Sequence, residues 1–278
     1  MERWDRTRAA ADAFLATIGA KPLVMGILNV TPDSFSDGGR FSTPESALAQ
    51  ARALARAGAD LIDIGAESTR PGYRPVDEQE EWARLEPVLG PLLEAIDLPF
   101  SVDTSKAAIA RRAVALGAAI VNDVSGLRGD PAMAELVAES GAAVVVMHNR
   151  PDIDPARDIV ADMIAFFEQS LALAAKAGVR REKIILDPGI GFGKTLEQNL
   201  RALAATNFLR EKFGLAVLIG VSRKRFLGDL TGAPTQDRLV PTIAANLDAL
   251  YRGANIFRVH DVAEHVAAFK VWTALDRA

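Results

Sequence analysis

Short apolar runs recur along the chain, and eight of them have the length and composition of β-strands. They read LVMGILNV (23–30), LIDIGA (61–66), PFSVDT (99–104), IVNDVS (120–125), AVVVMH (143–148), IILDPG (184–189), AVLIGVS (216–222) and IFRVHD (256–261). Because these runs are nearly continuous rather than alternating with polar residues, each strand is expected to be buried on both faces, as the strands of parallel sheets are.

Helix-like stretches rich in Ala, Leu, Glu and Arg separate the runs. The clearest is TPESALAQARALARAGA, in which Thr43 suits the N-cap, Pro44 the first helical position and Gly58 the C-terminal end. Others also close on glycine, at Gly117, Gly141 and Gly178. Eight strands, each followed by a helix, predict an α/β fold, a (β/α)8 TIM barrel that forms a single domain over residues 23–278. A doubly wound open sheet is the alternative.

Residues 1–22 form an N-terminal extension that is predicted to be helical. Its stretch RAAADAFLATIGA could be mistaken for a signal peptide, but Asp12 interrupts the apolar part. We therefore expect a short amphipathic helix packed on the domain surface. No apolar run reaches the length of a membrane span, so we expect no membrane partner. We expect a cytoplasmic location.

Composition narrows the possible functions. The chain is 49% hydrophobic and 24% charged, as soluble globular proteins are. The absence of cysteine excludes disulfides and thiolate metal sites. The formal net charge of −4 gives no support for nucleic acid as a partner, so an anionic ligand would have to be held by a few local basic groups.

Each run turns polar at its C-terminal side, and in a barrel these ends converge on one mouth where active sites are built. The polar residues at the run ends are Asn29; Glu67, Ser68, Thr69 and Arg70; Asp103; Asn122 and Asp123; His148; Asp187; Ser222, Arg223 and Lys224; and Arg258, His260 and Asp261. Asn122 and Asp187 lie inside apolar runs, so both are expected to be buried and hydrogen-bonded.

The stretch DPGIGFGKT, residues 187–195, ends as a phosphate-binding P-loop does. The P-loop template requires four residues between its first glycine and the Gly-Lys pair, whereas three separate Gly189 from Gly193. A flat loop that lets a ligand approach the backbone is the better interpretation. Lys194 is expected in the first turn of the following helix, facing solvent.

Seven stretches together resemble one enzyme family, dihydropteroate synthase. They are GILNVTPDSFSDGGRF, DIGAESTRPG, SVDTSK, VNDVSG, DPGIGFGKT, SRK and RVHD, in this order from about residue 23 to the C-terminus. The resemblance implies a (β/α)8 barrel, usually a homodimer, that condenses 6-hydroxymethyl-7,8-dihydropterin pyrophosphate with p-aminobenzoate. The products are 7,8-dihydropteroate and pyrophosphate, and this transferase step of folate biosynthesis is a target of sulfonamides.

The resemblance also implies roles for individual residues. The implied pterin pocket comprises Asp103, Asn122, Met147, Asp187 and Lys224. The implied pyrophosphate contacts are Asn29, Thr69, Arg258 and His260, with Asn29 also a ligand of Mg²⁺. The implied p-aminobenzoate contacts are Phe35, Thr69, Arg70, Phe192 and Ser222. In the implied dissociative mechanism pyrophosphate departs before the amine attacks, and the catalytic residues are Asp103, Asp187, Lys224, Arg258 and His260.

Residue chemistry agrees with these roles, and one stretch departs from the family. A pterin edge carries an amino group and ring N–H groups, which buried carboxylate and amide acceptors would recognise. Arg258 and His260 alternate along their run, so both side chains are expected on one side of the strand. The departure is Asn149-Arg150, where the family more often has Met followed by Gly or a similar residue.

Three other functions stay open from the sequence. A pterin-dependent methyltransferase would share the barrel and the pterin pocket, but TPDSFSDGG and SRK argue against it. A pterin-binding paralogue with little synthase activity has support only from Asn149 and Arg150. An unrelated barrel enzyme acting on sugar phosphates would also use the arginine and lysine residues.

Overall fold

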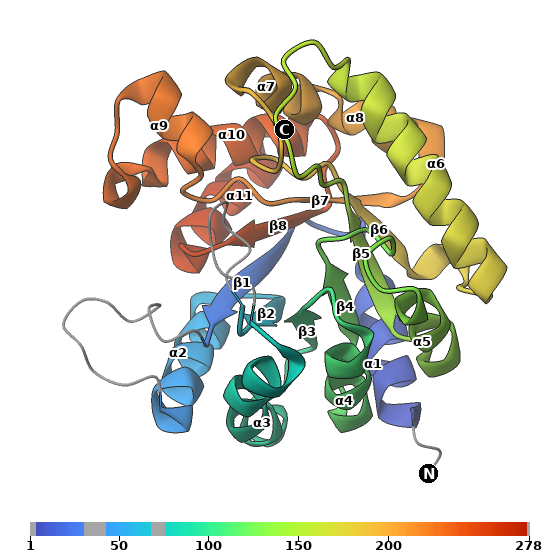
Figure 1. The fold of residues 1–278 in the computed structure, drawn as a ribbon. Helices are drawn as coiled ribbons and strands as arrows, with labels where there is room; N and C mark the ends of the chain where they lie inside the picture. Colours follow the sequence, from blue (N-terminus) through green and yellow to red (C-terminus); the bar gives the residue numbers. More distant parts are fainter. Residues whose placement is uncertain (1–3, 31–42, 68–75, 277–278) are drawn as a thin grey trace.

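The computed structural model describes residues 4–30, 43–67 and 76–276, and it shows a closed barrel of eight parallel strands (Figure 1). The strands pair in sequence order and β8 returns to β1, which confirms the TIM barrel and excludes an open sheet. They are β1 (Leu23–Asn29), β2 (Leu61–Gly65), β3 (Phe100–Asp103), β4 (Ile120–Asp123), β5 (Ala143–Met147), β6 (Ile184–Asp187), β7 (Ala216–Ile219) and β8 (Ile256–Val259).

Helices cover the outside of the barrel. They are α2 (Pro44–Ala57), α3 (Glu78–Ala95), α4 (Ala107–Leu116), α5 (Ala132–Ser140), α6 (Ile159–Ala177), α7 (Leu196–Ala204), α8 (Thr206–Phe213), α9 (Arg225–Thr231), α10 (Leu239–Tyr251) and α11 (Val262–Asp276), with 3₁₀ turns η1 (Arg181–Lys183) and η2 (Thr235–Asp237). The predicted ends of α2 are confirmed, because the Thr43 side chain accepts a hydrogen bond from the Ser46 amide and Gly58 is left-handed. Left-handed glycines also end α4, α5 and α6.

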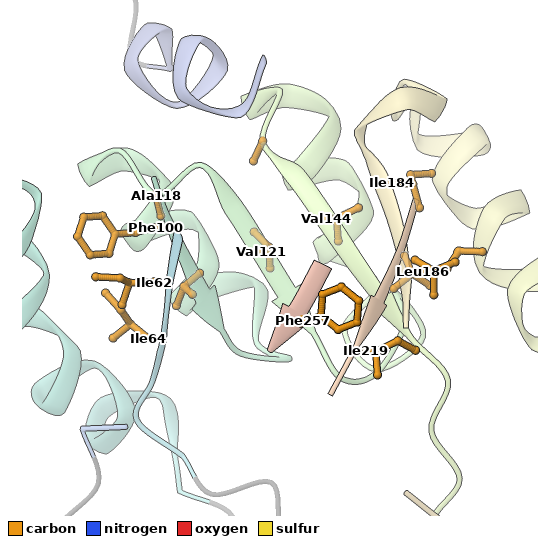
Figure 2. Close-up of a cluster of buried hydrophobic side chains, with 14 of the residues drawn as sticks. Ile62, Ile64, Phe100, Ala118, Val121, Val144, Ile184, Leu186, Ile219 and Phe257 are labelled. Carbon is orange, nitrogen blue, oxygen red and sulfur yellow. The ribbon is translucent and has the colours of Figure 1, made fainter. Parts of the chain in front are cut away.

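The strands are buried on both faces because their alternate side chains enter two separate cores. The outer core lies between strands and helices and includes Ile62, Phe100, Val144 and Phe257 (Figure 2). The inner core fills the lower half of the barrel; its strand and strand-flanking residues are Leu23, Met25, Leu61, Ala119, Ile120, Ala143, Val145, Ile185, Leu218 and Ile256. Apolar packing therefore ends below the mouth, and polar side chains take over above it.

Helix α1 (Asp5–Leu15) lies across the floor of the barrel. Its residues Ala11 and Phe14 belong to the inner core, at the end where the strands begin. The Thr7 hydroxyl donates to the Val114 carbonyl at 2.7 Å, and Asp12 pairs with the buried Lys183 at 2.7 Å. The helix therefore closes the inner core instead of only resting on the surface. No helix formed by the described residues is long and apolar enough to cross a membrane.

Candidate active site at the carboxyl ends of the strands

Strand register brings the predicted pterin residues to one rim. Asp103 pairs with Asn122 across β3 and β4, and Met147 pairs with Asp187 across β5 and β6. Asp103, Asn122 and Asp187 are 7%, 4% and 6% exposed, so the expected burial of Asn122 and Asp187 is confirmed. Side chains that alternate on these strands point into the barrel above the inner core.

Asp63 on β2 is a site residue that the sequence analysis missed. Its carboxylate is fully buried and accepts from Arg258 Nε at 2.6 Å, from Asn122 Nδ2 at 3.1 Å and from the Ser101 hydroxyl. The signal was present, because Asp63 interrupts the apolar run LIDIGA as Asp187 interrupts its own run. It was overlooked because it stands two residues before the end of its strand, below the tips of the runs.

The buried Asp103 carboxylate forms an ion pair with the half-buried Arg258 beside Asp63. Arg258 Nη2 donates to Asp103 Oδ2 at 2.8 Å, and the other carboxylate oxygen is buried without a hydrogen-bond partner in the described part of the chain. Burial raises the pKa of Asp103 to about 7 although the guanidinium opposes the shift. Burial would lower the pKa of Arg258, but Asp63 and Asp103 raise it overall, so the guanidinium stays charged.

Lys224 and Asp187 lie on the other side of the mouth. Lys224 Nζ donates to the Ile190 carbonyl and sits 4.6 Å from the centre of the Phe192 ring, which is a cation–π contact. Burial lowers the pKa of Lys224 to about 8 and raises the pKa of Asp187. A Cβ built on Gly220 would lie 3.9 Å from both Asp187 Oδ2 and Lys224 Nζ, so the glycine keeps space open beside the two groups.

Lys194 corrects the sequence prediction, because it is buried and lies before the helix. Thr195 caps α7, and Lys194 Nζ donates to the Gly189 carbonyl at 2.7 Å, to the Phe192 carbonyl at 3.1 Å and to His148 Nδ1 at 2.9 Å. Three acceptors match the three N–H groups of the ammonium, which is why burial is possible. Lys194 therefore stabilises the glycine-rich loop through two of its backbone carbonyls. Burial lowers the pKa of Lys194 to about 7.

His148 faces the outer core rather than the mouth. Strand alternation explains this, because Met147 precedes it and points the other way. Burial lowers the pKa of His148 to about 3, so the ring is neutral; Nδ1 accepts from Lys194 and Nε2 donates to Asp162 at 3.0 Å. Arg150 pairs with the same carboxylate at 2.9 and 2.7 Å. The unusual Arg150 thus supports α6 instead of entering the pterin pocket.

The ends of β7 and β8 bring Ser222 to His260. The two side chains lie 2.9 Å apart, from the hydroxyl oxygen to Nδ1, and the His260 amide donates to the Ser222 hydroxyl at 3.2 Å. Arg223 pairs with Asp261 beside them. Of the residues predicted to contact p-aminobenzoate, Phe192 and Ser222 lie at the mouth, while Phe35, Thr69 and Arg70 lie outside the described residues.

Asn29 ends β1 on the same rim and could contribute to a magnesium site. A Cβ built on Gly65 would lie 3.8 Å from Asn29 Oδ1 and 3.7 Å from Asp103 Oδ2, so the Asn29 amide oxygen lies near the carboxylate that Arg258 holds. The described residues contain no cluster of three or more His, Cys, Asp or Glu that could hold a metal alone. A single amide oxygen fits Mg²⁺, which often takes one or two protein ligands and the rest of its oxygens from water and a substrate phosphate.

Comparison with known proteins identifies this arrangement. The family described as pterin binding enzyme matches residues 25–260. A dihydropteroate synthase of Bacillus subtilis is 44% identical over 92% of this chain and 89% of its own length. A Clostridium difficile dihydropteroate synthase solved in the presence of pteroic acid has a TM-score of 0.90 and 43% identity, covering 94% of this chain and 99% of that one. A Xanthomonas albilineans dihydropteroate synthase with 4-aminobenzoic acid has a TM-score of 0.89 and 45% identity, covering 93% and 94%.

Proposed function

Since the chain belongs to the dihydropteroate synthase family of pterin-binding enzymes, we propose that it joins 6-hydroxymethyl-7,8-dihydropterin pyrophosphate to p-aminobenzoate. One observation carries the proposal: buried acceptors and cations from separate strands meet at one mouth. The ligands of the two structural relatives agree with it, because 4-aminobenzoic acid is the second substrate and pteroic acid contains both halves of the product.

The pterin ring is recognised by acceptors at the mouth. The free oxygen of Asp103, the amide oxygen of Asn122 and the carboxylate of Asp187 accept hydrogen bonds from the amino group and ring N–H groups of the pterin. Lys224 donates to the ring carbonyl, and Met147 packs against the ring. A ligand without these donors leaves buried acceptors unpaired, which gives strong discrimination.

The leaving diphosphate is held by cationic and neutral donors. Arg258 uses Nε and Nη2 on carboxylates, which leaves Nη1 for phosphate oxygens. His260 follows directly after β8 and lies beside Ser222. Asn29 is the protein ligand of Mg²⁺ in this proposal, with Thr69 as a further phosphate contact. The bound ion supplies positive charge that neutralises the diphosphate oxygens.

The reaction is dissociative. The bond between the pterin methylene carbon and the bridging oxygen breaks first, and its electron pair leaves with pyrophosphate. Asp103 and Asp187 stabilise the cation that develops on the methylene and the ring, because preorganised charges act where charge forms. The amine of p-aminobenzoate then forms the new C–N bond and releases one proton to water. Phe192 and Ser222, with Phe35, Thr69 and Arg70, hold this second substrate.

Turnover in an Asp187→Asn variant tests the proposal. Pyrophosphate release by the wild-type enzyme should require both substrates, and Asp187→Asn should lower kcat by about 100-fold or more, as the loss of one preorganised electrostatic contact does. Asp158→Asn is the matched control, since Asp158 caps α6 and asparagine caps equally well. Pterin binding without turnover in the wild type would instead support the inactive paralogue.

Assembly as a homodimer is part of the proposal. Val240, Ala244, Leu247 and Tyr251 follow a spacing of four, three and four residues along α10, which places them on one helix face. Val240 and Tyr251 are 74% and 80% exposed, so this apolar stripe is available to a second copy. Sedimentation velocity measures the assembly directly.

A cytoplasmic location is also part of the proposal, because the enzyme would then meet both of its substrates in the cytosol.

A further inference from the structure

Asp63 lies one layer below the mouth, between the inner core and the substrate. In the strand register Asp63 pairs with Ser101, whereas Asp103 and Asn122 pair with each other two residues further along. A ligand at the mouth would touch Asp103 and Asn122 first, so Asp63 can influence it only through these neighbours and Arg258. Nothing in the reaction itself requires a carboxylate at this depth.

The hydrogen bonds of Asp63 fix the direction of the Asn122 amide. A carboxylate paired with a guanidinium only accepts, so the Asn122 atom that faces it must be the Nδ2 donor. Nδ2 points down to Asp63 Oδ2 at 3.1 Å, and the described residues provide no donor to Oδ1 of Asn122. The amide oxygen is therefore the group left for the mouth.

The same oxygen of Asp63 also fixes Arg258. Nε of Arg258 donates to Asp63 Oδ2 at 2.6 Å while Nη2 donates to Asp103 Oδ2 at 2.8 Å. Two carboxylates on neighbouring strands thus hold the guanidinium by two different nitrogens. The Ser101 hydroxyl donates to the other oxygen of Asp63, whereas the bonds to Asn122 and Arg258 both go to Oδ2.

We propose that Asp63 is a positioning residue for pterin specificity: its Oδ2 turns the Asn122 amide so that the mouth presents an acceptor, and it holds Arg258 beside Asp103. The inference rests on the proposed function for the identity of the ligand. It explains how an amide, which could present either a donor or an acceptor, is restricted to matching the donor edge of a pterin.

Two substitutions separate this role from the alternative that Asp63 only supplies a negative charge to offset Arg258. Asp63→Ala removes the acceptor, and the dissociation constant of dihydropterin pyrophosphate, measured by calorimetry without p-aminobenzoate, should rise by about 10- to 100-fold, as expected when a buried donor loses its partner. Asp63→Asn keeps an oxygen in place of Oδ2 while removing the charge, so the rise should stay within about 5-fold. Equal losses in both variants would overturn the proposal in favour of charge balance.

Matched measurements check that the effect is specific. Ser101→Ala trims the same buried layer without touching Oδ2 of Asp63, and it should change pterin affinity by less than about 3-fold. The KM for p-aminobenzoate at saturating pterin substrate should be unchanged in both Asp63 variants. A loss in Ser101→Ala as large as in Asp63→Ala would mean that any disturbance of this layer weakens binding, which contradicts a specific role.

A measurement on the unmodified enzyme does not depend on any Asp63 variant folding or on turnover. With ¹⁵N-labelled asparagine side chains, the Nδ2 hydrogens of Asn122 should exchange slowly with water in the ligand-free enzyme, because they are buried against Asp63. Fast exchange in the ligand-free enzyme would place Nδ2 at the mouth and refute the orientation. Wild-type enzyme that shows slow exchange but no pterin affinity would refute the proposed function and leave the orientation supported.

Discussion

Two residues at the mouth, Asp103 and Lys224, must both be charged in the proposed mechanism, one by losing a proton and the other by keeping one. Burial raises the pKa of Asp103 to about 7 and lowers the pKa of Lys224 to about 8. The proposed mechanism needs Asp103 ionised, to stabilise the cation, and Lys224 protonated, to donate to the ring. The active form is therefore favoured only between the two pKa values.

The expected pH dependence follows from these directions. kcat/KM for the pterin substrate should rise as pH increases through about 7, because Asp103 loses its proton, and fall above about 8, because Lys224 loses its own. Because the charged groups at the mouth interact, the midpoints of the two limbs are apparent pKa values of the whole group. Lys224→Arg, which stays charged, should remove the alkaline limb even if activity is lower. A profile flat from pH 6 to 9 would exclude both assignments.

At the residue scale, the sequence correctly predicted burial where a polar residue interrupts an apolar run near its tip. Asn122 and Asp187 were found in this way. Asp63 also interrupts an apolar run and is buried, but it lies deeper in its strand than the run tips to which the prediction was limited. Lys194 could not be placed, because its burial depends on carbonyls and a histidine from segments that meet only in the folded barrel.

Among the structural elements, the loop after β6 is shaped by close approach of another backbone. Gly189 has a φ of 64°, and a Cβ there would lie 1.8 Å from the His148 carbonyl oxygen. Gly193 has a φ of 60°, with Arg150 backbone oxygen at 2.3 Å from its added Cβ. These glycines are therefore required by packing against the segment after β5, and not by contact with a nucleotide phosphate.

Alanine at position 189 should therefore be far more harmful than alanine at another left-handed glycine. Gly178 has a φ of 87° with nothing within 4 Å of an added Cβ, so Gly178→Ala should cost only about 1 kcal/mol of unfolding free energy. Gly189→Ala adds a clash with a backbone atom, which should displace Phe192 and Lys224. Urea unfolding and the KM for pterin should separate the two variants, and similar losses in both would show that the clash is relieved.

Element boundaries were predictable because local signals agree with the fold. Every observed strand starts within one residue of its run, and each ends one to three residues before the run does. The paired helices α7 and α8, and α9 and α10, were not distinguished in the sequence. The α7–α8 break falls at Ala205, which has no side-chain cap, and α9 ends at the left-handed Gly232. Neither residue differs from an ordinary loop signal when no partner is known.

At the scale of the whole molecule, the barrel separates stability from chemistry along its axis. The mouth gathers buried charges, which are costly to desolvate, while the floor is apolar and closed by α1. Hydrophobic pattern alone identified α1 as amphipathic but could not say which surface its apolar face covers. Only closure of the barrel creates the apolar floor that Ala11 and Phe14 fill.

This division predicts that a floor mutation lowers stability without changing catalysis. Phe14 is 4% exposed within the inner core, so Phe14→Ala should lower the free energy of unfolding by about 3–5 kcal/mol. Phe208→Ala on α8 makes the same change at a side chain 47% exposed and should cost much less. At a temperature where both variants are folded, kcat and both KM values should match the wild type, because the site is built at the opposite end of the strands. An altered KM in Phe14→Ala would mean that strain at the floor reaches the mouth through the strands, and the two ends could no longer be treated as independent.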